Sequence, residues 1–203
     1  RDYSELEAPA AIRDVVNRRT GRLSENGRRV LQAAAVVGGG LTTNLLSEIT
    51  GLSDWAVIES LEELEEAGLV QAEAFRHDLL RQSVYTSMPS ARRKALHGRA
   101  AAVLMEKRPL IEIAQHHMVA GEPDEACRMW IAAASELESR GLLAEANELV
   151  DTALGAVGES HLKSRLLATR ARLLRSAGEH VRAGELAQRL LEEATEDRVR
   201  ASA

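Results

Sequence analysis

The chain contains few aromatic residues and only one cysteine, and both shortages narrow the kinds of protein it can be. Phe, Trp and Tyr make up 2% of its 203 residues, whereas Ala, Leu, Glu and Arg are abundant. Because these abundant residues have high helix propensity, the composition favours helices that pack through small side chains. The single cysteine, Cys127, cannot form a disulfide within the chain, which excludes a disulfide-stabilised secreted fold. We therefore expect a helical, cytoplasmic protein.

Long apolar runs and an excess of positive charge are also missing. No apolar stretch approaches the ~20 residues needed to span a bilayer, so we expect no membrane segment. The net charge of −5 and a pI near 5.8 disfavour a general polyanion binder. The sequence starts at Arg1 with neither an initiator methionine nor a signal-peptide pattern, so we expect it to be part of a longer protein.

Catalytic motifs do not occur either. The glycine run Gly38–Gly40 is not followed by the lysine that a phosphate-binding loop requires. There is no Gly-x-Ser-x-Gly elbow and no His-Glu-x-x-His pair. The neighbours His116 and His117 would point about 100° apart on a helix and cannot share a metal ion. We expect no catalytic residue, no metal site and no cofactor-binding residue in this chain.

The first 89 residues predict short helices followed by a β hairpin. Apolar residues at helical spacing predict helices over 9–22 and 24–37, between Thr42 and Gly51, and between Ser53 and Gly68. Ser24, Thr42 or Thr43, and Ser53 are the expected N-caps. Residues 69–75 alternate partly and predict a small hairpin or wing. This order is typical of a winged helix-turn-helix, which we assign to 23–89, with 1–22 as a linker helix from an upstream domain.

From residue 77 onward nearly the whole sequence predicts helix. The expected helices are 77–87, 91–106, 110–120, 123–139, 142–156, 160–177 and 179–195. A glycine followed by two small or apolar residues recurs at constant spacing, in Gly121/Ala126/Ala133, Gly141/Ala146/Ala153 and Gly178/Ala183/Leu190. The last two of these units are 37 residues apart, close to the roughly 34 residues of tetratricopeptide repeats, so we assign 90–203 to a tetratricopeptide-like helical repeat domain. Such arrays bind partners along an extended surface. The predicted fold is therefore mainly α.

The charge of the third helix of the winged-helix region argues against DNA reading. That helix would enter the major groove, yet between Ser53 and Ala67 it carries six acidic residues and neither lysine nor arginine. Phosphate contacts supply most of the affinity for DNA, so we do not expect direct DNA binding. The basic residues lie elsewhere, in two groups: Arg13, Arg18, Arg19, Arg22, Arg28 and Arg29, and then Arg92, Arg93 and Lys94. They are interpreted as solvated or ion-paired faces, or alternatively as a surface for phosphate or an acidic partner.

Several segments together resemble a known family. These are Phe75 to Tyr85 with Met88-Pro89, residues 92–97, Leu23 to Val37, residues 60–70 and Gly121 to Ala134. The chain resembles the signalling ATPases of the STAND type, particularly bacterial LuxR-type transcription regulators, over nearly its whole length. In that family a nucleotide-binding domain precedes a winged helix and tetratricopeptide-like sensor repeats. The resemblance implies ADP or ATP in the full-length protein, and an inducer or protein partner at the repeats.

The family's winged helix carries a His-Asp pair, and the matching residues here are His77 and Asp78. The resemblance implies that this histidine contacts a phosphate of bound ADP and holds the resting state. Arg76 stands where the plant relatives have methionine. A histidine at a helix N-terminus can donate to a phosphate oxygen beside free backbone N–H groups. The alternative for His77 is a capping or packing role at the start of the helix.

Three functional hypotheses follow. The first is the regulatory part of a STAND-type transcription regulator, in which the winged helix relays nucleotide state and the repeats sense a partner. The second is a winged-helix DNA-binding repressor with a helical dimerisation domain. The third is a tetratricopeptide-like scaffold adaptor that binds a peptide.

Overall fold

The computed structural model describes residues 16–158 and 161–201, and these form two compact units. The first unit ends at Leu104 and the second begins at Met105. Of the expected helix over 9–22, residues 16–20 are helical, and the rest of its beginning lies outside the described residues. The described residues are mainly α-helical, with one very short antiparallel hairpin. None of their helices is both long and apolar enough to cross a membrane.

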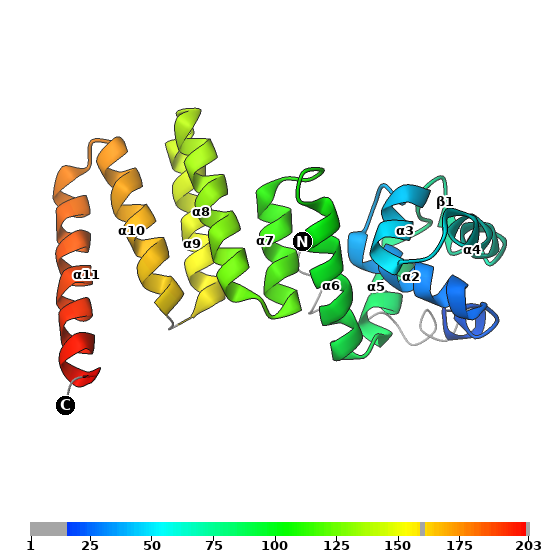
Figure 1. Cartoon of the computed structure of the whole chain (residues 1–203). Helices are drawn as coiled ribbons and strands as arrows, with labels where there is room; N and C mark the ends of the chain where they lie inside the picture. Colours follow the sequence, from blue (N-terminus) through cyan, green and yellow to red (C-terminus); the bar gives the residue numbers. More distant parts are fainter. Residues whose placement is uncertain (1–15, 159–160, 202–203) are drawn as a thin grey trace. The chain divides into compact units, whose positions relative to one another are not determined.

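The first unit contains the helices and the hairpin expected from the sequence. Its elements are α2 (Glu25–Val37), α3 (Thr43–Thr50), α4 (Asp54–Glu66), β1 (Val70–Gln71), β2 (Ala74–Phe75), α5 (Asp78–Ser87) and α6 (Ser90–Leu104) (Figure 1). The predicted N-caps are confirmed, since Ser24, Thr42 and Ser53 each accept a backbone N–H from the first turn of α2, α3 and α4. These side-chain bonds satisfy N–H groups that a helix start otherwise leaves without a partner.

The hairpin after α4 is confirmed and is built around a two-residue turn. Val70 pairs with Phe75 and Gln71 with Ala74 in an antiparallel register. The turn residues Ala72 and Glu73 have φ of 49° and 60°, the left-handed values that a tight hairpin turn needs. The Glu73 carbonyl also accepts the Leu41 N–H at 3.0 Å, so the segment after α2 is hydrogen-bonded to the hairpin. The glycine run that precedes Leu41 is thus part of the fold around the hairpin.

Helix α2 lies at the centre of the first unit, where it contacts α3, α4, α5 and α6. Its buried face includes Val30, Leu31 and a run of small residues, which lets the neighbouring helices approach closely. Helix α6 belongs to this unit because it packs on α2 and α3. Arg99 of α6 donates to the Ile49 carbonyl at 3.2 Å. The boundary between the compact units therefore lies after Leu104. The domain boundary at 89/90 expected from the sequence stays a prediction.

The second unit consists of helices that pack in sequential order. They are α7 (Leu110–Ala120), α8 (Pro123–Ser139), α9 (Leu143–Val157), α10 (His161–Ser176) and α11 (His180–Ala201) (Figure 1). Each helix contacts the next along the chain, and α8 also contacts α10. The core is formed by alanines and leucines together with Trp130, whose side chain is 3% exposed.

The recurring glycines and alanines lie at equivalent places in the second unit. Gly121, Gly141 and Gly178 have φ between 76° and 87°, and each comes just after a helix end. Only glycine adopts this backbone conformation without strain. Five residues after each glycine, Ala126, Ala146 and Ala183 are buried in the following helix. The repeat signal in the sequence therefore corresponds to a repeated helix–turn–helix packing unit.

Candidate functional site

His77 and Asp78 lie side by side in the chain at the start of α5, immediately after the hairpin. Both side chains are exposed. His77 is the N-cap residue in an extended conformation, and its side chain makes no capping hydrogen bond. Its carbonyl accepts the N–H groups of Leu80 at 3.0 Å and Arg81 at 3.4 Å. The carbonyl thus accepts the first hydrogen bonds of α5, and the imidazole caps no helix N–H.

The electrostatics of this helix start suit a negatively charged group. The first N–H groups of a helix have no intrahelical acceptor and carry partial positive charge. Asp78 occupies the first turn of α5, where a carboxylate is favourable for the same reason. The role in nucleotide sensing that the family resemblance implies for His77 and Asp78 stays a prediction.

Two arginine side chains meet at the turn that leads from α4 into the hairpin. Arg19 donates from Nη1 to the Gly68 carbonyl at 2.9 Å. A β-carbon built on Gly68 would lie 3.3 Å from Arg19 Nη1 and 3.6 Å from Arg76 Nη1. The backbone N–H of Arg76 is itself bound to the Leu69 carbonyl at 3.1 Å. The guanidinium groups of Arg19 and Arg76 therefore both lie beside Gly68. Arg76 directly precedes His77 in the chain.

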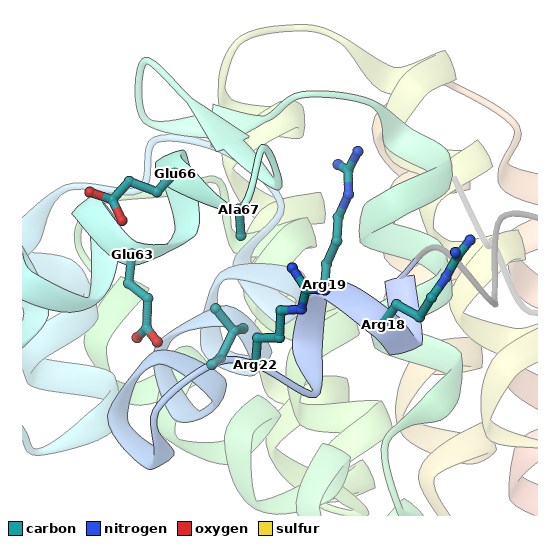
Figure 2. A pocket seen from close by; sticks show the side chains of 7 residues that line it. Arg18, Arg19, Arg22, Glu63, Glu66 and Ala67 are labelled. Carbon is teal, nitrogen blue, oxygen red and sulfur yellow. The ribbon is translucent and has the colours of Figure 1, made fainter.

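A pocket of about 670 Å³ lies next to this turn, and we call it the arginine pocket. It is lined by Arg18, Arg19, Arg22, Leu23, Glu63, Glu66 and Ala67 (Figure 2). In Figure 2 the side chains of Arg19 and Arg22 extend in a similar direction, whereas Arg18 diverges from them. These arginines belong to the first basic group of the sequence, which does not indicate that they line one cavity with the end of α4.

The two glutamates of the arginine pocket are oriented differently. Glu63 points to the turn before α2, where Oε1 accepts the Ser24 N–H at 2.6 Å and Oε2 accepts the Ser24 hydroxyl at 2.7 Å. Glu66 points away from the arginines in Figure 2. The carboxylate of Glu63 is thus already bound to the N-terminus of α2, a place where negative charge is favourable.

Apart from Glu63, the acidic residues of α4 form an exposed surface. Asp54, Glu59, Glu62, Glu65 and Glu66 are all exposed. Trp55, on the same helix, is 75% exposed. Because the acidic side chains are not buried in the unit, the negative charge expected for this helix lies at its surface.

The two adjacent histidines of α7 are buried. His117 Nδ1 lies 2.7 Å from Glu122 Oε2, and the buried Nε2 has no hydrogen-bond partner among the described residues. Burial lowers the pKa of His116 to about 4, with smaller contributions from the positive charges of His117 and Arg108. The contact to Glu122 spans a turn, and the sequence analysis did not find it.

Cys127 lies in the core of the second unit. It is fully buried, and burial raises the pKa of its thiol. Its sulfur lies 4.0 Å from the Leu162 carbonyl of α10. In the described part of the chain no three His, Cys, Asp or Glu side chains are grouped as a metal site would require.

Comparison with known proteins gives one distant relative and no named activity. No family model matches the chain, and no solved structure matches it. An uncharacterized protein of Rhizobium meliloti (strain 1021) is 30% identical over 157 residues, which cover 68% of this chain and 15% of the relative. The chain thus spans only a small part of the length of the curated relative it matches.

Proposed function

We propose that the chain is the non-catalytic regulatory part of a STAND-type transcription regulator. In this proposal the first unit acts as a winged helix that relays nucleotide state from an upstream nucleotide-binding domain. The second unit acts as a tetratricopeptide-like sensor of an inducer or protein partner. The observation that carries the proposal is the exposed His77–Asp78 pair, which starts α5 directly after the hairpin.

The surroundings of His77 support the relay. Its imidazole is exposed at a helix N-terminus, where it is available to donate to a phosphate oxygen of ADP held by the upstream domain. Asp78 follows it, and Arg76 adds a positive charge immediately before it. Loss of the phosphate contact on nucleotide exchange would release the winged helix and shift the protein towards its active state.

The second unit supports the sensor role through its construction. Helices α7 to α11 pack one after another, with a buried small residue at the same place after each repeated glycine. Arrays of this kind present a continuous surface to which each helical hairpin contributes. A partner bound there would change the stability of the array and thereby bias the relay.

The decisive experiment compares the full-length protein with its His77→Ala variant. The relay predicts that the variant retains less ADP through purification and shows raised basal transcription of its target. His180→Ala removes another exposed histidine, on α11, and serves as the matched control that should behave like wild type. Unchanged ADP retention in His77→Ala would contradict the relay, as would an open reading frame without a nucleotide-binding domain upstream.

The scaffold adaptor is the second candidate, and the sequential packing of α7 to α11 favours it equally. It needs no nucleotide and no role for His77. It predicts that His77→Ala leaves both ADP retention and basal activity unchanged while peptide binding by the second unit persists. The experiment above therefore separates the two candidates.

A further inference from the structure

We propose that the arginine pocket binds the phosphate group of a small-molecule ligand. This inference does not depend on the nucleotide relay, because it involves neither His77 nor an upstream domain. It rests on the side chains that line the cavity, on the carboxylates that do not neutralise them, and on the shape and surroundings of the cavity.

Among the described residues three arginines and two glutamates line the arginine pocket, so its lining carries one net positive charge. Glu63 is bound through both oxygens to Ser24, and Glu66 points away from the arginines in Figure 2. Within the described residues, neither Arg19 nor Arg22 forms an ion pair with a carboxylate. Arg19 uses one donor on the Gly68 carbonyl, and a guanidinium has five N–H donors in all. Most of the donor capacity of these two side chains thus remains available.

The backbone that carries these arginines is held in place. Gly21 N–H binds the Asn17 carbonyl at 2.9 Å, Arg22 N–H the Arg19 carbonyl at 3.3 Å, and Leu23 N–H the Thr20 carbonyl at 3.2 Å. Leu23 is 5% exposed and anchors the turn in the core. A ligand would therefore meet arginines on a fixed turn, which reduces the entropy lost on binding.

A phosphate group fits this donor arrangement better than a simple halide or a neutral group. Guanidinium groups are planar forks that bind phosphate oxygens in pairs, with charge-assisted hydrogen bonds. The hydrogen bond to the Gly68 carbonyl explains the position of Arg19, but it gives no role to Arg22. Arg22 is exposed and lines the same cavity.

The size and surroundings of the pocket favour a small molecule over a nucleic acid. A volume of about 670 Å³ is in the range typical of small-molecule sites. The exposed carboxylates of α4, including Glu62 and Glu66, lie on the helix that borders the pocket and would repel an extended polyanion.

The test is isothermal titration of the 203-residue chain with pyrophosphate, with succinate, a dicarboxylate dianion, as the control for an anion that lacks phosphate. Loss of one charge-assisted contact in Arg22→Gln should weaken pyrophosphate binding about tenfold or more. Arg28→Gln removes the same charge from an exposed position of α2 outside the pocket and should leave the affinity within about twofold of wild type. Circular dichroism and the melting temperature verify that both variants are folded.

Three results would overturn the proposal. The first is that pyrophosphate does not bind at millimolar concentration. The second is that Arg22→Gln and Arg28→Gln weaken pyrophosphate binding equally. The third is that succinate binds as tightly as pyrophosphate. His77→Ala should leave pyrophosphate binding by this chain unchanged, because His77 does not line the pocket. A result that contradicts phosphate binding by the arginine pocket can therefore be distinguished from a result that contradicts the nucleotide relay.

Discussion

His116 occupies a position at which burial opposes its own protonation. Only 5% of the residue is exposed, and its pKa is lowered from 6.5 to about 4, mainly by burial and further by the charges of His117 and Arg108. The unfolded chain therefore binds a proton at this residue at a higher pH than the folded chain does. Folding loses stability as the pH falls from 6.5 towards 4, and this residue contributes no pH dependence above that window.

We therefore predict that acidification destabilises the second unit through His116. Between pH 7 and pH 5 this residue alone should remove about 2 kcal/mol from the free energy of unfolding. Urea unfolding at the two pH values, followed by the fluorescence of the buried Trp130, measures the change. His116→Gln should lose that part of the pH dependence, while His180→Gln, a change at an exposed histidine, should retain it. An identical pH dependence in wild type and His116→Gln would contradict the assignment.

Residues whose role depends on the local sequence were predictable, and residues whose role depends on distant contacts were not. Ser24 and Ser53 cap helices because of their position within a few residues of an apolar repeat, and the structure confirms both. The burial of His116 depends on packing between helices, so its sequence neighbourhood gave no sign of the altered pKa. The contact from Arg19 to Gly68 joins residues 49 positions apart, and no local pattern indicates it.

Among the elements, α2 and α4 are joined by a contact that adds to the cap at Ser24. Glu63 of α4 binds both the N–H and the hydroxyl of Ser24, and the same hydroxyl accepts the Gly27 N–H at 2.9 Å. A β-carbon at Gly27 would overlap the Glu63 carboxylate. Glycine weakens a helix, so its presence in the first turn of α2 is explained by the room that the carboxylate needs.

This arrangement predicts that Gly27→Ala has opposite effects in two backgrounds. In wild type the new methyl group displaces Glu63, and the lost hydrogen bonds should outweigh the gain in helix propensity, for a net destabilisation of about 1 kcal/mol. In the Glu63→Ala variant the methyl group meets no carboxylate, so the same change should stabilise by about 0.5–1 kcal/mol. Urea unfolding of the four proteins gives the coupling between the two positions. Additive effects would show that Glu63 does not act through this contact.

The helices and strands were predictable because each has a periodic pattern of apolar residues and a residue that ends it. The alternation over 69–75 corresponds to β1 and β2, and the glycines before α8, α9 and α11 end the preceding helices as expected. Which helices pack against one another was less predictable. The sequence predicts a helix over 91–106 but not what covers it, and the structure shows that α2 and α3 pack against α6.

At the scale of the whole molecule, the position of charge is more informative than its total. The net charge is −5. Exposed carboxylates are concentrated on α4, whereas the adjacent arginine pocket is basic. A duplex that approached α4 in the manner of a recognition helix would meet negative charge along its length. The basic residues that remain are partly engaged by the protein, since Arg29 donates to the Thr50 carbonyl and Arg92 to Gln32.

We predict that the chain does not bind duplex DNA, even at low salt. The measurement is the fluorescence anisotropy of a labelled mixed-sequence duplex titrated with the protein at low and at moderate salt. Non-specific binders have dissociation constants of about 10⁻⁴–10⁻⁶ M at physiological salt and bind much more tightly when salt is low, so micromolar protein is sufficient. Replacing Glu59 and Glu62 with lysine should raise the low-salt affinity if the carboxylates of α4 are what repels the duplex. Tight wild-type binding that weakens steeply with salt would contradict this interpretation of α4 and favour the DNA-binding repressor over the regulatory relay.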